Sequence, residues 1–198
     1  MSKLEARPLP FSAELTGISE KTLAIHHDKL YAGYVAKVNE VREKLQNVDL
    51  STANQSYSDL RSLKDGESFA LNGVYLHEDY FNVLGGDGRV SDSSLRDAIA
   101  AEFGSLETFE KLFKACGMAA RGWVVLAHDT HDGKLHLYTA DAHNQGGVWG
   151  AIPVLVLDVY EHAYFLDYGA DRKAYIEDYW KNLNWGAANA VFERADRF

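Results

Sequence analysis

The chain has 198 residues, 46% of them hydrophobic and 12% aromatic, which is enough to build a substantial core. Its 20 basic and 29 acidic side chains leave a formal charge of −9, which argues against a general nucleic-acid binder or an anionic-membrane binder. No stretch approaches the roughly 20 uninterrupted apolar residues of a membrane helix, and residues 1–17 lack the apolar core of a secretory signal. The single cysteine, Cys116, cannot form an internal disulfide, so we expect a cytoplasmic protein.

The first half of the chain predicts two helices. Residues 18–46 carry apolar side chains at helical spacing, and Ser19 is a suitable N-cap. Residues 47–66 are polar and predict a loop with room for a short helix. Apolar side chains then share one helical face in residues 69–84, before Gly-Gly-Asp-Gly ends the pattern. The two helices are expected to form an antiparallel hairpin.

The pattern changes after residue 88, which predicts a helical-hairpin domain of residues 1–88 and a second domain of residues 89–198. Two helical segments come first, over 91–102 and 106–120. Two strands then surround the Asp132-Gly133 turn, the apolar run PVLVLDV predicts a buried third strand, and helices resume from His162. The chain is therefore of the α+β class, with an N-terminal antiparallel helical hairpin followed by a C-terminal domain with a three-stranded antiparallel sheet and flanking helices.

Three of the eight histidines are candidates for chemistry from their positions alone. His26 and His27 are adjacent on the first helix and so point about 100° apart, and His26 is the one that follows the apolar face. His77 lies on the apolar face of the second helix. An inward histidine can be a hydrogen-bonded core residue or a metal ligand, and two on facing helices favour a shared metal. Four other histidines lie in or beside the polar hairpin, are expected to be exposed and are set aside: His128, His131, His136 and His143.

Asp158 and His162 form a sharper pattern where the third strand ends. A carboxylate at the end of a buried strand is costly unless it is paired or coordinated. Asp158 could orient His162 by a hydrogen bond, or both could bind a metal, and the spacing leaves both possibilities open. Three neutral imidazoles with one carboxylate would suit manganese or iron, and the absence of thiolates argues against structural zinc.

The segment LDVYEHAYF resembles the LDVWEHAYY signature of manganese/iron superoxide dismutases. Six further segments are similar to that family in the same order, over essentially the whole chain: LPF, KTLAIHHDK, YLHEDYF, GW, HNQGG and NLNW. The resemblance implies one manganese or iron ion bound by His26, His77, Asp158 and His162. It also implies that superoxide is converted to dioxygen and hydrogen peroxide by alternating reduction and oxidation of that ion.

The same resemblance assigns roles around the metal. It makes Tyr34 the active-site tyrosine that gates access and relays protons. It makes Gln145 the glutamine beside the metal-bound solvent, because Gly73 fills the other position from which the family supplies it, and this arrangement slightly favours manganese. It implies a homodimer with Glu161 and Tyr164 near the subunit interface. Basic side chains at the entrance would attract superoxide, and the candidates are Lys29 and Arg172.

The chain also departs from the family pattern. Leu30 stands where a histidine usually supports the ligands, and three positions lack a common tryptophan: Phe81, Val125 and Tyr160. These departures support an alternative, a dismutase-derived metal-binding or structural protein with weak or lost dismutase activity. A metal-dependent hydrolase or oxygenase ranks last, because no plausible general base accompanies Asp158.

Overall fold

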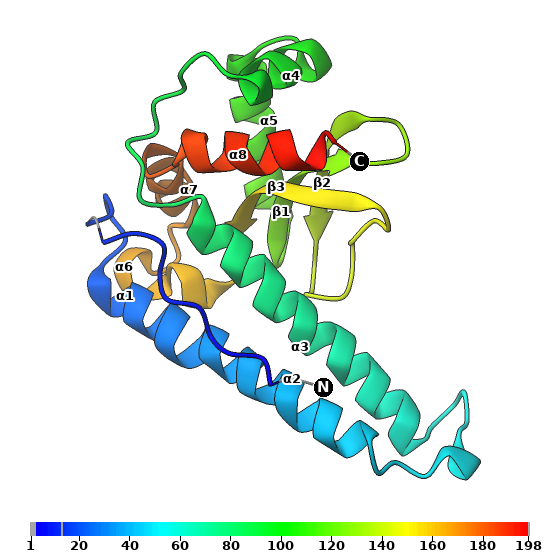
Figure 1. Cartoon of the computed structure of the whole chain (residues 1–198). Coiled ribbons are helices and arrows are strands. Elements are labelled where there is room, and N and C mark those ends of the chain that lie inside the picture. Colours follow the sequence, from blue (N-terminus) through cyan, green and yellow to red (C-terminus); the bar gives the residue numbers. More distant parts are fainter. Residues whose placement is uncertain (1–2, 13, 198) are drawn as a thin grey trace.

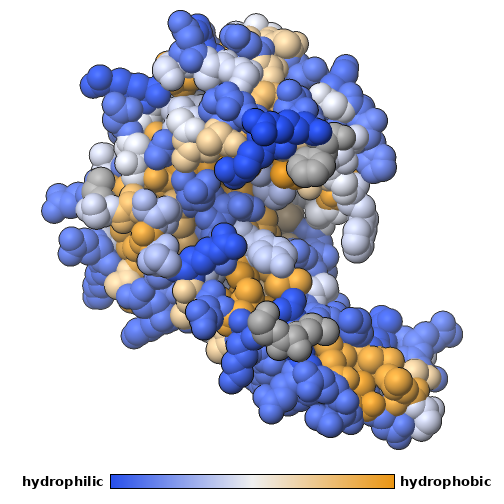
Figure 2. Space-filling view, in the orientation of Figure 1, coloured by the Kyte–Doolittle hydropathy of each residue, from blue (hydrophilic) through white to orange (hydrophobic). Residues whose placement is uncertain are grey.

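A computed structural model describes residues 3–12 and 14–197. A long helical hairpin projects from a second part in which helices pack around a small sheet (Figure 1). This arrangement confirms the predicted α+β class. Polar side chains cover most of the face seen in Figure 2, and apolar side chains gather on part of the projecting hairpin. Within the described residues, none of the helices combines the length and apolarity needed to cross a membrane.

The first arm of the hairpin is one continuous helix with an irregular middle. It consists of α1 (Glu20–Ala24), a π-helical segment η1 (Ile25–Tyr31) and α2 (Ala32–Leu45). Ser19 is the N-cap, accepting a hydrogen bond from the Thr22 amide at 3.2 Å. The amide of Ala32 reaches the carbonyl of His27, five residues earlier, which produces the wider turn of η1. The single predicted helix is confirmed, although its spacing did not indicate the π-helical turn.

The second arm, α3 (Asp59–Asn82), begins ten residues before the predicted start at residue 69. The turn-forming residues Lys64-Asp65-Gly66 favoured a loop, and this prediction is wrong because Ser58 caps the helix earlier, accepting from the Arg61 amide at 3.2 Å. The connection between the arms holds only a short 3-10 turn, η2 (Leu50–Thr52).

The C-terminal part begins with α4 (Ser94–Phe103) and α5 (Leu106–Ala119), each capped by the serine before it. The sheet follows, with β1 (Trp123–Asp129), β2 (Lys134–Ala140) and β3 (Ala151–Asp158) in the antiparallel order β2-β1-β3. The last elements are helical: η3 (Glu161–Ala163), α6 (Phe165–Tyr168), α7 (Arg172–Lys181) and α8 (Trp185–Ala195). The three predicted strands and the flanking helices are therefore confirmed.

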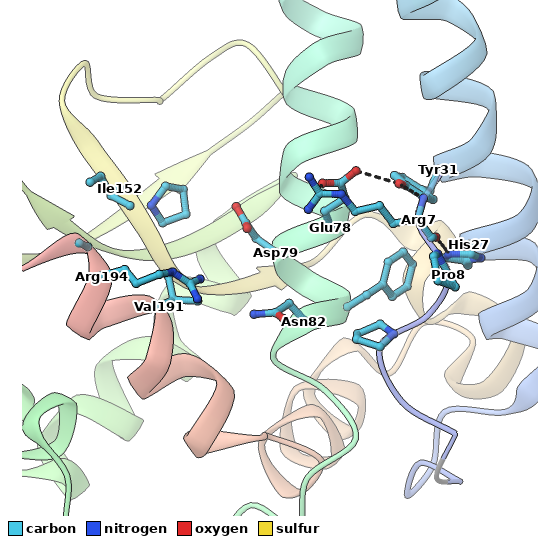
Figure 3. Close-up of a pocket in the computed structure, with 14 residues that line it drawn as sticks. Arg7, Pro8, His27, Tyr31, Glu78, Asp79, Asn82, Ile152, Val191 and Arg194 are labelled. Atoms are coloured by element: carbon cyan, nitrogen blue, oxygen red, sulfur yellow. Dashed lines mark hydrogen bonds and ion pairs between the residues drawn. The ribbon is translucent and has the colours of Figure 1, made fainter. Parts of the chain in front are cut away.

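The N-terminal segment crosses both arms of the hairpin. The Arg7 amide donates to the Tyr31 hydroxyl at 2.8 Å, while the Arg7 guanidinium pairs with Glu78 on α3 at 3.1 Å. Beside this crossing, a cavity of about 480 Å³ separates the segment from α3 and α8, and both Asp79 and Arg194 line it (Figure 3). These contacts tie the segment to both arms of the hairpin, and α3 also packs against β3.

Candidate metal centre

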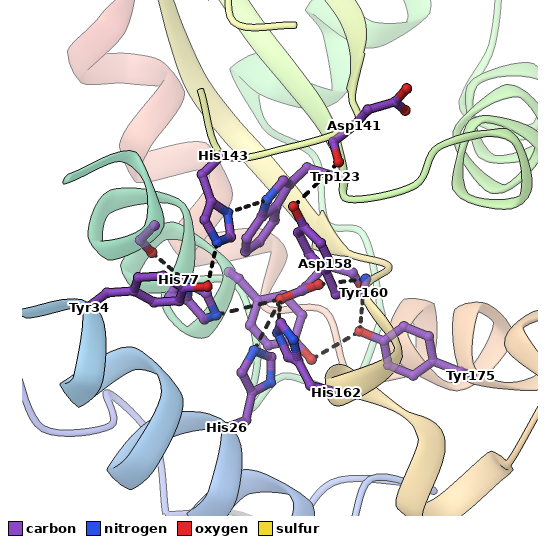
Figure 4. A network of polar contacts seen from close by, with 12 residues as sticks. His26, Tyr34, His77, Trp123, Asp141, His143, Asp158, Tyr160, His162 and Tyr175 are labelled. Carbon is purple, nitrogen blue, oxygen red and sulfur yellow. Dashed lines mark hydrogen bonds and ion pairs between the residues drawn. The ribbon is translucent and has the colours of Figure 1, made fainter. Parts of the chain in front are cut away.

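Four side chains meet where the hairpin approaches the end of the sheet (Figure 4). His26 comes from η1, His77 from α3, Asp158 from the last position of β3 and His162 from η3. One donor atom from each lies within 4.8 Å of the others. The structure thus brings together all four residues that the sequence nominated as metal ligands.

The donor atoms converge on one carboxylate oxygen. Asp158 Oδ2 lies 3.1 Å from the Nε2 atom of His26, 3.1 Å from that of His162 and 3.7 Å from that of His77. The other oxygen, Oδ1, accepts the Tyr160 amide at 2.9 Å, which fixes the orientation of the carboxylate. A further bond from the Tyr175 hydroxyl to the Asp158 carbonyl, at 2.7 Å, anchors the backbone.

Burial makes this cluster expensive unless a cation compensates it. His26, His77 and Asp158 are at most 1% exposed. His77 Nδ1 donates to the Gly73 carbonyl at 2.5 Å, so in the neutral ring Nε2 carries the lone pair. Yet His77 Nε2 is buried and has no hydrogen-bond partner among the described residues. A lone pair aimed into a buried cluster beside a carboxylate is what a metal ligand requires.

The protonation states of His26, His77 and Asp158 suit a metal. Burial lowers the pKa of His77 to about 3, and burial also lowers the pKa of His26, so both rings are neutral. Burial alone would raise the pKa of Asp158, but its contacts with His162 and His26 outweigh that effect and hold the pKa below its usual range. An ionised carboxylate with imidazole nitrogens fits a manganese or iron ion.

The two adjacent histidines of η1 point in different directions. His26 is 1% exposed and points into the cluster. His27 points towards the N-terminal segment, where its Nε2 donates to the Arg7 carbonyl at 2.8 Å and its Nδ1 lies 2.7 Å from Asp28 Oδ1. His27, the competing candidate on this helix, is therefore outside the cluster. π-helical turns inside α-helices are often found at functional sites, as here.

A second hydrogen-bond network lies beside the cluster and includes Tyr34. His143 Nε2 lies 2.8 Å from the Tyr34 hydroxyl, and the Trp123 indole N–H donates to His143 Nδ1 at 3.0 Å. Because an indole N–H can only donate, Nδ1 must accept, and the proton of the neutral His143 ring is on Nε2. Burial lowers the pKa of His143 to about 4, which keeps the ring neutral. His143 therefore donates to the Tyr34 oxygen, and the hydroxyl proton of Tyr34 remains free to be donated elsewhere.

His143 is the functional candidate that sequence reasoning missed. The polar surroundings predicted exposed positions for His128 and His143, but the two residues are only 3% and 5% exposed, so both predictions are wrong. The structure does not bring Gln145 to the cluster. Its side chain is exposed, and its backbone N–H donates to the Ala142 carbonyl at 3.2 Å in a turn. Spacing could not separate the two positions, because the turn decides which side chain faces inward.

Tyr164 has a partner in place of the missing histidine at position 30. Its hydroxyl accepts a hydrogen bond from Arg172 Nε at 3.2 Å, and a second guanidinium nitrogen donates to the Ala120 carbonyl at 2.8 Å. Tyr164 is buried, so this contact satisfies a polar group that Leu30 could not. Glu161 and Lys29 are both exposed.

Aromatic rings surround the cluster despite the three missing tryptophans. Tyr160 stacks on the His162 ring with centroids 5.3 Å apart, and Phe81 packs edge-on against His26 at 5.1 Å. Trp123 packs edge-on against His77 at 5.1 Å. Two of the three replacements thus still hold ligand rings in place.

Family models match both parts of the chain. The model of the iron/manganese superoxide dismutase alpha-hairpin domain matches residues 3–85, and that of the C-terminal domain matches residues 91–191. The chain belongs to the iron/manganese superoxide dismutase family. The resemblance noted in the sequence is thereby confirmed.

Named relatives of the family carry either metal. The chain is 44% identical to "Superoxide dismutase [Fe]" of Aquifex pyrophilus, over 98% of the chain and 92% of that protein. It is 39% identical to "Superoxide dismutase [Fe]" of Cupriavidus metallidurans, over 98% of each. It is 34% identical to "Superoxide dismutase [Mn] 1" of Halobacterium salinarum, over the full length of both. The two more similar of these three relatives are named for iron.

Proposed function

We propose that the protein is a superoxide dismutase in which His26, His77, Asp158 and His162 hold one iron or manganese ion. The observation that carries the proposal is the convergence of three imidazole nitrogens on one oxygen of the buried Asp158. The bound ion would supply the redox chemistry, taking an electron from one superoxide and giving it to a second. Net consumption of two superoxides and two protons yields one dioxygen and one hydrogen peroxide.

The protein's own residues would supply protons and orientation. Tyr34 is half-buried, and its ring lies 5.4 Å from that of His77. His143 holds the Tyr34 oxygen through Nε2–H, so the tyrosine can donate its own proton toward the cluster. We therefore assign to Tyr34 the delivery of a proton and to His143 the positioning of Tyr34. His143 takes the place in this proposal that the family resemblance gave to Gln145.

We propose a site that suits iron and manganese equally. The expected slight preference for manganese depended on Gln145, whose side chain is exposed, and two of the three relatives described above are named for iron. Three imidazoles and a carboxylate suit both ions.

We also propose a homodimer formed around the loop that carries His162. Phe165 and Leu166 are 54% and 53% exposed, close in sequence to the exposed Glu161 and to Tyr164. Adjacent exposed apolar side chains favour an interaction surface.

Lys29 and Arg172 would attract superoxide to the chain despite its formal charge of −9. A cytoplasmic location and a domain boundary at residues 88/89 are further proposals, the latter supported by the gap between the matched ranges 3–85 and 91–191.

The ligand assignment can be tested with His77→Gln and, as a matched control, His131→Gln, because His131 is exposed and outside the cluster. Metal per chain and superoxide consumption would be measured for each. His77→Gln should lose most of both, because a buried ligand is removed, whereas His131→Gln should retain both. A fully metal-loaded and active His77→Gln protein would refute the assignment.

A further inference from the structure

A second group of metal-ligating side chains lies at the β1–β2 turn and plays no part in the dismutase centre. Asp129 ends β1, Asp132 lies in the turn and His136 is in β2. Asp129 pairs with Lys134 and Ala127 pairs with His136 across the antiparallel ladder. Residues two apart on a strand point to the same face, and so do directly paired residues on neighbouring strands. Asp129 shares a face with Ala127, and Ala127 with its partner His136, so Asp129 and His136 project from the same face. We call Asp129, Asp132 and His136 the turn triad.

The donor atoms of the turn triad are already close together. One atom from each residue lies within 4.8 Å of the others, and His136 Nε2 is 2.8 Å from Asp132 Oδ2. Donor atoms bound to one ion at about 2 Å each lie roughly 3 to 3.5 Å apart. Because these side chains are only partly buried or exposed, they have room to rotate towards a bound ion.

Neighbouring contacts hold these side chains in position. Asp129 Oδ1 accepts the His131 amide at 2.9 Å, and Asp132 Oδ1 accepts the Lys134 amide at 3.0 Å. The second oxygen of Asp132 accepts a hydrogen bond from His136 Nε2, so a bound ion would take the place of the proton in that bond. The Tyr138 ring stacks on the His136 imidazole with centroids 5.9 Å apart, and its hydroxyl donates to Asp129 Oδ2 at 3.3 Å. The tyrosine thus links the two sides of the triad.

The charge of the turn triad favours a cation. Among the described residues, neither carboxylate forms an ion pair with a lysine or arginine. The one ion-pair partner of Asp132 in this part of the chain is His136. Two carboxylates thus face one imidazole. Two carboxylates and one imidazole leave open coordination positions for water and suit a divalent transition-metal ion. We propose that the turn triad binds such an ion, with Zn²⁺ as its probe, separately from the dismutase metal.

The experiment uses the untagged protein with its dismutase centre already filled. Zn²⁺ would be titrated calorimetrically into the wild type, His136→Gln, Asp132→Asn and, as a control on the same turn, His131→Gln. We expect one additional Zn²⁺ per chain, with affinity at least about tenfold weaker in the first two variants and unchanged in the control, because each of the first two loses one of three ligands. Dismutase activity should be the same in all four proteins before zinc is added.

Two outcomes would overturn the proposal. The first is that no additional zinc binds, which would leave His136 and Asp132 as a simple surface ion pair. The second is that His136→Gln binds zinc as tightly as the wild type, or that His131→Gln loses binding to the same extent. Either result would leave the dismutase assignment intact, because that assignment is read from activity and from the first metal ion.

Discussion

Replacing His143 by leucine tests the network that orients Tyr34. The leucine fills much of the same space but removes two hydrogen bonds, the 3.0 Å bond from the Trp123 indole and the 2.8 Å bond to the Tyr34 hydroxyl. Trp123 is fully buried, so its N–H would lose its acceptor, at a cost of about 1–3 kcal/mol in the free energy of unfolding. Tyr34 is only half-buried and can bond to water instead.

The expected effect on activity is larger than the effect on stability. Hydrogen-bond partners of metal ligands typically contribute 10- to 100-fold, and we expect a comparable fall in superoxide consumption per bound metal when Tyr34 loses His143. The assay is dismutase activity normalised to measured metal, with urea unfolding run in parallel. His143→Gln should restore much of the activity, since an amide can accept from Trp123 and donate to Tyr34. Gln145→Ala, at an exposed position, should change little.

Per-metal activity of His143→Leu within about twofold of the wild type would refute the positioning role of His143. A large loss in Gln145→Ala would refute it as well, and would return the role to the residue that the family resemblance implied. A loss of activity explained entirely by lost metal would show that His143 acts on metal retention instead.

Three further predictions concern other contacts. Gly73→Ala would place a Cβ 3.0 Å from the Tyr34 ring, so activity per metal should fall although the helix still forms; unchanged activity would contradict the packing argument. Arg172→Met removes the donors to Tyr164 and to the Ala120 carbonyl, and should lower the free energy of unfolding in urea by about 1–3 kcal/mol. The control Lys173→Met, at an exposed neighbouring position, should leave that free energy unchanged. Equal stabilities of the two variants would contradict the role of Arg172. Burial and the nearby Glu78 charge raise the pKa of Asp79 to about 7, above its ordinary 3.8. The folded state then holds a proton that the unfolded state releases, so the free energy of unfolding falls as pH rises from about 4 to 7. Asp79→Asn removes this pH dependence, so the stability that it gains over the wild type should be larger at pH 8 than at pH 5.5, by about 1–3 kcal/mol. A pH-independent difference between the two proteins would contradict the raised pKa.

The elements of the fold follow largely from the sequence because their signals are local. Serine caps, apolar spacing and the Asp132-Gly133 turn each act over a few residues, and the strands and most helices form where these patterns predict them. The start of α3 was mispredicted because Gly66 suggested a turn, whereas the cap at Ser58 and packing along the hairpin keep this segment helical. Local preference is weak when tertiary packing opposes it.

The candidate ligands were also accessible from the sequence, but the surroundings of the site were not. Helix geometry distinguishes His26 from His27. Asp158 and His162 are identified by their position at the end of a strand. The role of His143 depends on the turn after β2, which buries one side chain and exposes Gln145 two residues later. A polar segment gives no pattern from which that orientation could be read. The same holds for the contact of Arg172 with Tyr164, which joins separate elements.

The most direct test of the account is superoxide consumption per bound ion, measured after the purified protein has been reconstituted separately with iron and with manganese. The account predicts one ion per chain at the four-residue cluster and rapid dismutation with at least one of the two metals. A protein that binds one ion of either metal but consumes no superoxide would contradict it, and would favour a metal-binding descendant that has lost the activity.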